Sequence, residues 1–211
     1  GAALCNAEDD IILVSKLGMS LKFQANDEQL RPMGRQTAGV QGMKFREGDE
    51  LLAMDVVWGD SDKDLFVVTN EGFAKRTAIS EYRLQGRNGF GVKAVQLAEG
   101  RGSLVGAVIV EEDDQIMAIM KSGKVIRSNV DEVKRTGRTT QGVTFAKPDK
   151  NDEIISIARN EEKDDDESAE NVENATVDAT ANEGTAQSPE SAVEAPAETN
   201  AESGDGENVE A

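Results

Sequence analysis

The chain has 211 residues, with 41 acidic and 23 basic side chains and a formal charge of −18. Because histidine is absent, a histidine general base and a histidine metal site are excluded. The single cysteine, Cys5, excludes a disulfide within the chain and a four-cysteine zinc site. No apolar run approaches the roughly 18 residues of a transmembrane helix, and no basic-then-apolar signal opens the chain. We therefore expect a cytosolic protein with no membrane partner.

The negative charge is concentrated at the C-terminal end. Residues 1–160 hold 22 basic and 24 acidic residues, a balance of −2, whereas residues 161–211 hold 1 and 17, a balance of −16. Residues 161–211 also lack Leu, Ile, Phe, Tyr and Trp, so they cannot bury enough apolar surface to offset chain entropy. We expect a disordered acidic tail. It either keeps the protein soluble or makes an intramolecular contact that competes with nucleic acid for a basic surface.

The first 160 residues contain a unit of about 50 residues that is repeated three times. Each copy opens with an apolar run that ends in a glycine turn, and then carries the pattern Gly-Arg-x-x-x-Gly-Val. The three patterns stand in register with the three turns, which indicates true internal repeats. The turn glycines are Gly18, Gly72 and Gly123, and the pattern glycines are Gly34, Gly86 and Gly137.

Each unit contains four short segments rich in Val, Ile and Leu and bounded by Gly, Asp and Asn, which is typical of β-strands. In the first unit these are Ile11–Lys16, Ser20–Phe23, Gly39–Phe45 and Leu51–Val57. A two-residue turn ending in glycine joins the first two segments, as in a tight hairpin. Four antiparallel strands per repeated unit predict an all-β fold built from β-propeller blades.

The repeat divides the chain into a short segment, three blade units and the tail. Residues 1–10 align with residues 106–114, so we expect them to end a preceding blade. Three blades are also fewer than the four to eight that usually close a propeller, and the chain is therefore expected to be a C-terminal fragment of a longer protein. The expected divisions are 1–10, 11–63, 64–113, 114–160 and the tail, 161–211.

Basic residues recur at equivalent places in the three units. Equivalent positions on stacked blades lie on one rim, where an array of cations can follow a curved polyanion. Two alternatives stay open, because edge-strand cations also block sheet-to-sheet aggregation and the loop glycines also serve as turn residues. The candidate DNA-binding residues are Lys22, Arg35, Lys44, Lys75, Arg76, Arg87, Lys93, Lys124, Arg127, Lys134, Arg135 and Arg138.

The loops around these residues lack interleaved aromatics, and no segment resembles a recognition helix, so we expect phosphate binding without base reading. Trp58 and Tyr82 are expected to pack against other residues, and Cys5 to lie in an apolar strand core. The acidic run at 111–114 is expected to form a turn between blades. We find no catalytic residues and no metal site in the sequence.

The three Gly-Arg units, together with Arg31-Pro-Met-Gly-Arg-Gln-Thr-Ala-Gly-Val-Gln-Gly-Met-Lys-Phe45 and Phe73-Ala-Lys-Arg-Thr-Ala-Ile-Ser-Glu-Tyr82, resemble the C-terminal domain of the DNA gyrase A subunit. The likeness is closest to actinobacterial forms. It implies a six-bladed β-pinwheel, a propeller variant in which blades exchange a strand, and these units would be its last three blades.

The resemblance also implies a function and partners. Double-stranded DNA would wrap around the basic perimeter of the pinwheel and support ATP-dependent negative supercoiling. The complex would contain two A and two B subunits, in the bacterial cytoplasm and associated with the chromosome. The fragment itself would hold no cofactor and no active site, since ATP and magnesium would be used elsewhere in the complex.

The family's box, Gln-Arg-Arg-Gly-Gly-Lys-Gly, has its nearest match in the middle unit, which the resemblance marks as a degenerate second box. Two alternatives stay open: the C-terminal domain of the topoisomerase IV A subunit, and a protein-interaction β-propeller. The latter expects recurring aromatic residues, which make up only 4% of this chain. The degenerate box keeps Gln85, Arg87, Gly89 and Gly91, and has Gly86, Asn88 and Phe90 in place of Arg, Gly and Lys.

Overall fold

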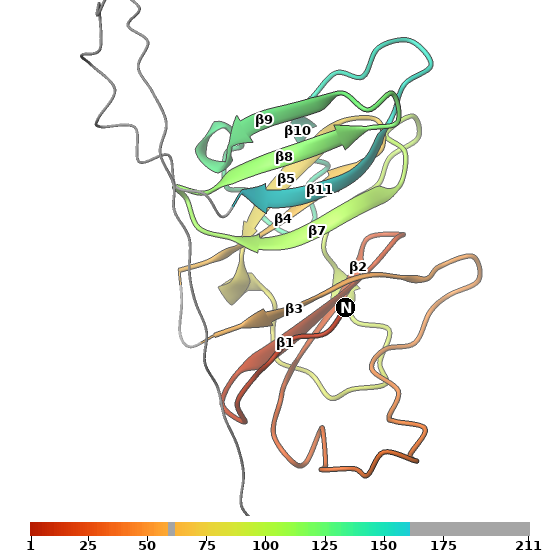
Figure 1. The fold of residues 1–211 in the computed structure, drawn as a ribbon, viewed down its shortest axis with the longest axis vertical. Coiled ribbons are helices and arrows are strands. Elements are labelled where there is room, and N and C mark those ends of the chain that lie inside the picture. The colour runs from red at the N-terminus through yellow and green to blue at the C-terminus, as the bar shows by residue number, and fades with distance from the viewer. Residues whose placement is uncertain (59–61, 161–211) are drawn as a thin grey trace, which may run out of the picture. The chain divides into compact units, whose positions relative to one another are not determined.

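The computed structural model describes residues 1–58 and 62–160 (Figure 1). This part of the chain folds into eleven β-strands and two single-turn 3₁₀ helices, η1 (Ile79–Glu81) and η2 (Val130–Glu132). Within it, no helix is long and apolar enough to cross a membrane. The expected acidic tail lies outside the described residues. The all-β class is confirmed.

The first sheet is antiparallel and has the strand order β3-β1-β2-β6. Strands β1 (Asp10–Ser15) and β2 (Met19–Gln24) form the expected hairpin, and β3 (Leu51–Val57) pairs with the other edge of β1. The fourth strand, β6 (Val92–Lys93), belongs to the second unit and pairs with β2. The sheet therefore combines residues from two repeat units.

The second sheet repeats this plan, and the third sheet shows three of the four strands. The second has the order β10-β5-β4-β7, and its edge strand β10 comes from the third unit. The third has the order β11-β8-β9 within the described residues. The strands are β4 (Asp64–Thr69), β5 (Phe73–Ala78), β7 (Leu104–Val110), β8 (Gln115–Met120), β9 (Val125–Asn129), β10 (Val143–Thr144) and β11 (Ile154–Asn160).

The short strands β6 and β10 show that neighbouring units exchange a strand. Each begins directly after the second glycine of a Gly-Arg pattern and closes the hairpin of the preceding unit. The expectation that this segment completes its own unit's sheet is therefore wrong. In the first unit, residues 39–45 form no strand, only an isolated bridge from Met43 to Gly89. The exchanged-strand pinwheel implied by the resemblance is confirmed.

The core lies between successive sheets. Strand β4 is buried along its whole length. Because successive strand residues point to opposite faces, Leu65 and Val67 join the apolar cluster shared with the first sheet, and Phe66 and Val68 join the one shared with the third. Tyr82 is 2% exposed in the first of these clusters, so its expected packing role is confirmed.

Residues 1–9 precede β1 and form no strand. The expected core position of Cys5 is wrong, because its side chain is exposed. A segment without a sheet to join cannot bury its apolar residues, and Leu4 is likewise 93% exposed.

The basic residues that follow the first two hairpin turns form interior ion pairs. Lys22 Nζ lies 3.4 Å from Asp10 Oδ2, and Arg76 Nε lies 3.4 Å from Asp64 Oδ2. In both units the carboxylate opens the first strand and the cation lies diagonally across the hairpin. Asp64 is 1% exposed. Burial raises its pKa above the ordinary value, while the guanidiniums of Arg135 and Arg76 act in the opposite direction.

Two glycines are essential to the strand exchange. Gly91 and Gly142 have φ of +73° and +81°, and a Cβ on either would collide with a backbone carbonyl of the preceding hairpin, that of Ser20 or Ala74. Gly39 occupies the equivalent place in the first unit with φ of +80°, but a Cβ there would meet nothing within 4 Å. Gly39 is therefore a natural control for the effect of close approach.

The first prediction concerns the buried ion pair of the middle unit. Asp64→Asn should lower the unfolding free energy by about 3–5 kcal/mol, because it removes the buried carboxylate that pairs with both Arg76 and Arg135. The control is Glu112→Gln, which removes the exposed partner of Arg76 and should cost about 0–1 kcal/mol. Urea unfolding of the whole chain measures both, and equal losses would contradict the interior role of Asp64.

The second prediction concerns the exchange glycines. Gly39→Ala should cost roughly 1–2 kcal/mol, the penalty of a left-handed backbone on a residue with Cβ. Gly91→Ala and Gly142→Ala should cost more, because the new methyl also displaces the exchanged strand. Since 1 kcal/mol corresponds to about 2–4 °C for a domain of this size, thermal unfolding separates the variants. Equal melting temperatures for all three would argue against the close approach.

Candidate nucleic-acid interface

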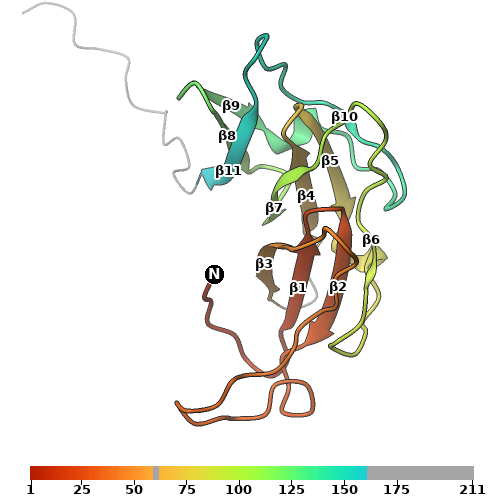
Figure 2. The same ribbon diagram turned by 90° about the vertical axis from the view of Figure 1, so that its right-hand side faces the viewer.

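One long loop in each unit connects the hairpin to the next long strand, and the second and third of these loops run along the sheet edges opposite β3 and β7 (Figure 2). The second loop, which comes after β5 in the chain, lies alongside β2, and there the amide of Gln85 donates to the carbonyl of Lys22 over 2.8 Å. The third loop, which comes after β9 in the chain, lies alongside β5, and there the amide of Thr136 donates to the carbonyl of Arg76 over 2.8 Å. The second and third loops thus each cover the hairpin edge of the unit before them.

Neighbouring loops also contact one another. Lys44 and Gly89 are joined by a backbone hydrogen bond of 2.7 Å, and Asn88 and Gly42 by one of 2.6 Å. A bond of 3.0 Å from Gln96 to the Thr140 carbonyl joins the second loop to the third. We call the three connected segments, residues 31–46, 83–98 and 133–148, the outer loop row.

The outer loop row carries basic residues and no acidic ones. Its three segments hold 4, 3 and 4 basic residues, which is half of the 22 in residues 1–160, and none of the 24 acidic residues. The local charge is thus strongly positive although residues 1–160 are nearly neutral overall. A surface of this kind attracts a polyanion.

The arginines of the Gly-Arg patterns connect adjacent units. An Nη atom of Arg87 donates to the carbonyl of Gln41 over 2.8 Å, and Arg138 donates in the same way to the carbonyl of Lys93 over 3.0 Å. Their backbone amides are held as well, by Gln29 for Arg87 and by Glu81 for Arg138. These contacts account for the arginine of the second and third patterns, whereas Arg35 of the first makes no such contact among the described residues. The side chains of Arg87 and Arg138 remain only half-buried, so part of each guanidinium faces solvent.

The first glycine of the pattern has no comparable role in the fold. Gly34 and Gly86 do not have positive φ, and a Cβ on either would meet nothing within 4 Å. The conformation of a turn therefore does not require glycine at these two places. A glycine at such a place leaves the backbone amides open to close approach by a phosphate.

The structure separates the candidate cations into surface and interior groups. Arg35, Lys44 and Lys134 are exposed on the outer loop row, and their side chains have no hydrogen-bond or ion-pair partner among the described residues. Lys93 is exposed there too and donates to Gln96. Arg135 is engaged in ion pairs with Asp62 and Asp64.

Two candidates lie outside the row. Lys124 follows the turn between β8 and β9 and lies 3.8 Å from a carboxylate oxygen of Asp149. Arg127 is exposed on β9. Neither shares a surface segment with the loop cations.

Three other candidates lie inside the protein, which sequence reasoning did not anticipate. Lys22, Lys75 and Arg76 are 9%, 1% and 4% exposed. Lys22 and Arg76 belong to the ion pairs described above, and Lys75 donates to the backbone carbonyls of Ala94 and Arg138. These cations cannot contact DNA while they hold their interior partners, so phosphate contact by them does not fit the structure.

The structure also adds surface cations to the candidates chosen from the sequence. Arg46, Arg83 and Lys147 are exposed within the outer loop row. Arg83 recurs in register with Arg31 and Lys134, three residues before the first glycine of each pattern, and Lys147 stands at the place of Lys44, so the repeat itself signals both. Arg46 has no basic counterpart in the other units, and its sequence signal is the run of residues without any carboxylate.

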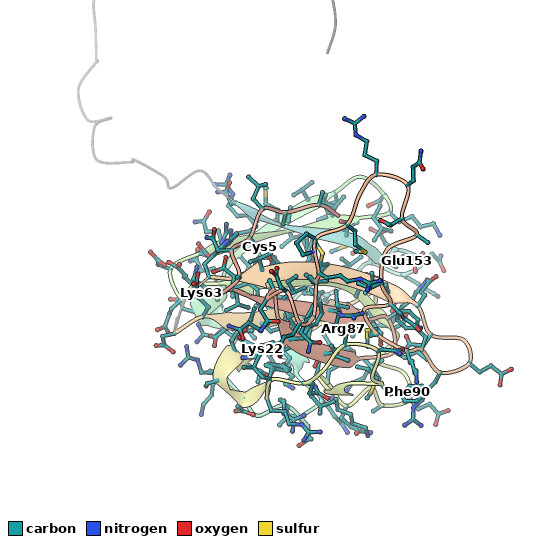
Figure 3. The ribbon with its side chains drawn as sticks, turned by 90° about the horizontal axis from the view of Figure 1, so that it is seen from below. Cys5, Lys22, Lys63, Arg87, Phe90 and Glu153 are labelled. Carbon is teal, nitrogen blue, oxygen red and sulfur yellow. The ribbon has the colours of Figure 1, made fainter. Side chains whose placement is uncertain are left out.

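The degenerate box, residues 85–91, lies within the second segment of the outer loop row. Asn88 has φ of +62°, which is uncommon for a residue with a Cβ. Phe90 is 47% exposed, and the Arg46 guanidinium lies 5.7 Å from its ring centre. Figure 3 shows Arg87 near the middle of the molecule in that view and Phe90 nearer its margin. The loops thus do present an aromatic side chain, contrary to the expectation from sequence.

The described residues contain no group of three or more Cys, Asp or Glu side chains arranged to hold a metal ion. The acidic residues at 111–114 form the link between β7 and β8, where the Asp114 carboxylate accepts from the Glu111 amide over 2.8 Å. This is the turn that was expected from the sequence.

Known relatives are similar to this chain over most of its length. The DNA gyrase A subunit of Streptomyces coelicolor is 54% identical over 162 residues, which cover 77% of this chain and 19% of the relative. The DNA gyrase A subunit of Mycolicibacterium smegmatis is 49% identical over 190 residues, which cover 90% of this chain and 21% of the relative. The chain thus spans about a fifth of the length of these curated relatives.

Solved structures share the fold. A DNA gyrase A C-terminal domain matches with a TM-score of 0.66 and 29% identity, over 74% of this chain and 52% of the other. A C-terminal domain of DNA topoisomerase IV matches with a TM-score of 0.68 and 22% identity, over 74% and 48%. The family described as "DNA gyrase C-terminal domain, beta-propeller" matches residues 9–57, 63–111 and 114–161. The chain belongs to this family.

Proposed function

We propose that the outer loop row binds the phosphates of double-stranded DNA without base reading and bends the duplex along the sheet edges. The observation that carries this proposal is the segregation of charge, with 11 basic and no acidic residues in the three segments of the row. Membership of the gyrase C-terminal domain family supports the same assignment.

The binding would be electrostatic and largely indifferent to sequence. Each phosphate that a cation neutralises releases condensed counterions and adds about 0.9 to the slope of log affinity against log salt. Bending a site of 20–30 base pairs by 40–90° costs roughly 1–6 kcal/mol. A row that continues over three units offsets this cost, because a curved duplex reaches cations that a straight one does not.

The larger assembly is part of the proposal. The chain would serve as the distal part of a gyrase A subunit, in a complex of two A and two B subunits in the bacterial cytoplasm, and would support ATP-dependent negative supercoiling. ATP and magnesium would be used by other parts of that complex. The A subunit of topoisomerase IV is the nearest alternative. The identity of about half to gyrase A relatives over most of this chain favours gyrase.

The third prediction tests the cations of the row. Arg35→Ala combined with Lys44→Ala should weaken binding to a long duplex of random sequence and reduce the salt slope by about 1.8, the value for two phosphates. The control combines Lys16→Ala with Lys121→Ala, two exposed cations in ion pairs outside the row. Fluorescence anisotropy over a salt series measures both. A salt-independent affinity of the unaltered chain would refute the proposal.

The fourth prediction concerns residues 161–211, which carry a charge balance of −16. If this segment competes with DNA for the row, ending the chain after Asn160 raises DNA affinity, most at low salt where the Debye length reaches about 30 Å. A chain whose tail carboxylates are changed to amides should bind as tightly as the shortened one. If neither variant binds DNA more tightly than the unaltered chain, the tail does not compete with DNA, and only its solubilising role is left.

A further inference from the structure

Lys75 lies where three units meet. It is 1% exposed on β5 of the second unit. Its ammonium donates over 2.5 Å to the carbonyl of Ala94, whose own amide is bonded to Gly18 of the first unit. The same ammonium donates to the carbonyl of Arg138, in the loop of the third unit. One side chain therefore connects structures from three repeats.

The repeat does not require a lysine at this place. The equivalent positions, three residues after the turn glycine, hold Leu21 and Ile126 in the other units. An ammonium is also costly to bury. Burial lowers the pKa of Lys75 to about 8, with Arg138 acting in the same direction and the Glu81 carboxylate in the opposite one. A lysine retained against this cost indicates a local purpose that an apolar residue does not serve.

The hydrogen bonds of Lys75 reach two cations of the outer loop row. Ala94 directly follows Lys93, and Lys75 holds the carbonyl of Ala94 while Arg138 holds the carbonyl of Lys93. Lys75 also holds the carbonyl of Arg138, and Glu81 accepts from the amide of Arg138 over 3.0 Å. The backbones that carry Lys93 and Arg138 are thereby fixed to each other.

We propose that Lys75 is a positioning residue for DNA binding, which fixes the spacing of Lys93 and Arg138 on the outer loop row without itself contacting DNA. This inference rests on the proposed function. The buried side chain of Lys75 would change DNA affinity through Lys93 and Arg138, the two residues that it positions.

Protonation of Lys75 gives the proposal a distinctive signature. An ammonium has three donors and the neutral amine two, so deprotonation keeps both carbonyls satisfied but removes the charge that strengthens these bonds. DNA affinity should therefore fall as pH rises through about 8. The unfolding free energy, in contrast, should rise with pH over the same range. The unfolded lysine, with the ordinary pKa of 10.5, binds more protons than the folded one between about pH 8 and 10.

The fifth prediction uses Lys75→Leu, which copies Leu21 of the first unit. At pH 7 this variant of the whole chain should show a salt slope lower by up to about 1.8, because two phosphate contacts lose their geometry. Adding Lys93→Ala should lower the slope by about 0.9 in the unaltered chain and by much less in the Lys75→Leu background. An effect on folding alone would leave these contributions additive.

The pH profile of the unaltered chain tests the proposal without any substitution. We expect DNA affinity to fall between pH 7 and 9 while urea unfolding shows no loss of stability, and we expect Lys75→Leu to lack this change. Steep salt-dependent binding that is the same in Lys75→Leu, with an unchanged pH profile, would overturn the positioning role alone. Absence of salt-dependent binding by the unaltered chain would overturn the proposed function together with it.

Discussion

The outer surface depends on one contact, the closure of the first two hairpin edges by two residues of the following unit. Without β6 and β10, the outer edges of β2 and β5 would expose unpaired amides and carbonyls. With them, the loops that contain these strands are held against the preceding sheet, and their cations form one continuous row. The same short strands thus pair the backbone groups at the sheet edges and hold the basic loops in place. Both roles require glycine at positions 91 and 142, because a Cβ there would collide with the preceding hairpin.

Charge in this protein serves two purposes that the repeat alone does not separate. Arg76 is fixed in the interior by Asp64, and Arg87 and Arg138 connect successive loops through backbone carbonyls. The side chains of Lys44 and Arg35, in contrast, make no such contacts among the described residues. Recurrence in register therefore does not separate the cations that hold the fold together from those that face solvent, since Arg35 recurs with Arg87 and Arg138. The absence of carboxylates marks the surface suited to DNA.

Much of the fold was predictable from sequence, because the repeat, the glycine turns and the apolar runs depend on local patterns. The burial of Lys22 and Arg76 was not. Each lies on a second strand of a hairpin, and its exposure is decided by a loop about 60 residues further along the chain that covers that strand. Their partners Asp10 and Asp64 stand eight residues before the turn glycine, a spacing that is visible in the sequence but has no meaning until the hairpin register is known.

The exchange of strands also determines how the protein responds to pulling. Under the proposed function, a duplex under tension would pull on the outer loops, and the second and third loops are hydrogen bonded to the sheet of the unit before them. A force applied at Lys93 is therefore shared between the chain connections of the second unit and the ladder of the first. A load on the row would therefore pass from unit to unit through these strand pairs instead of resting on one unit alone.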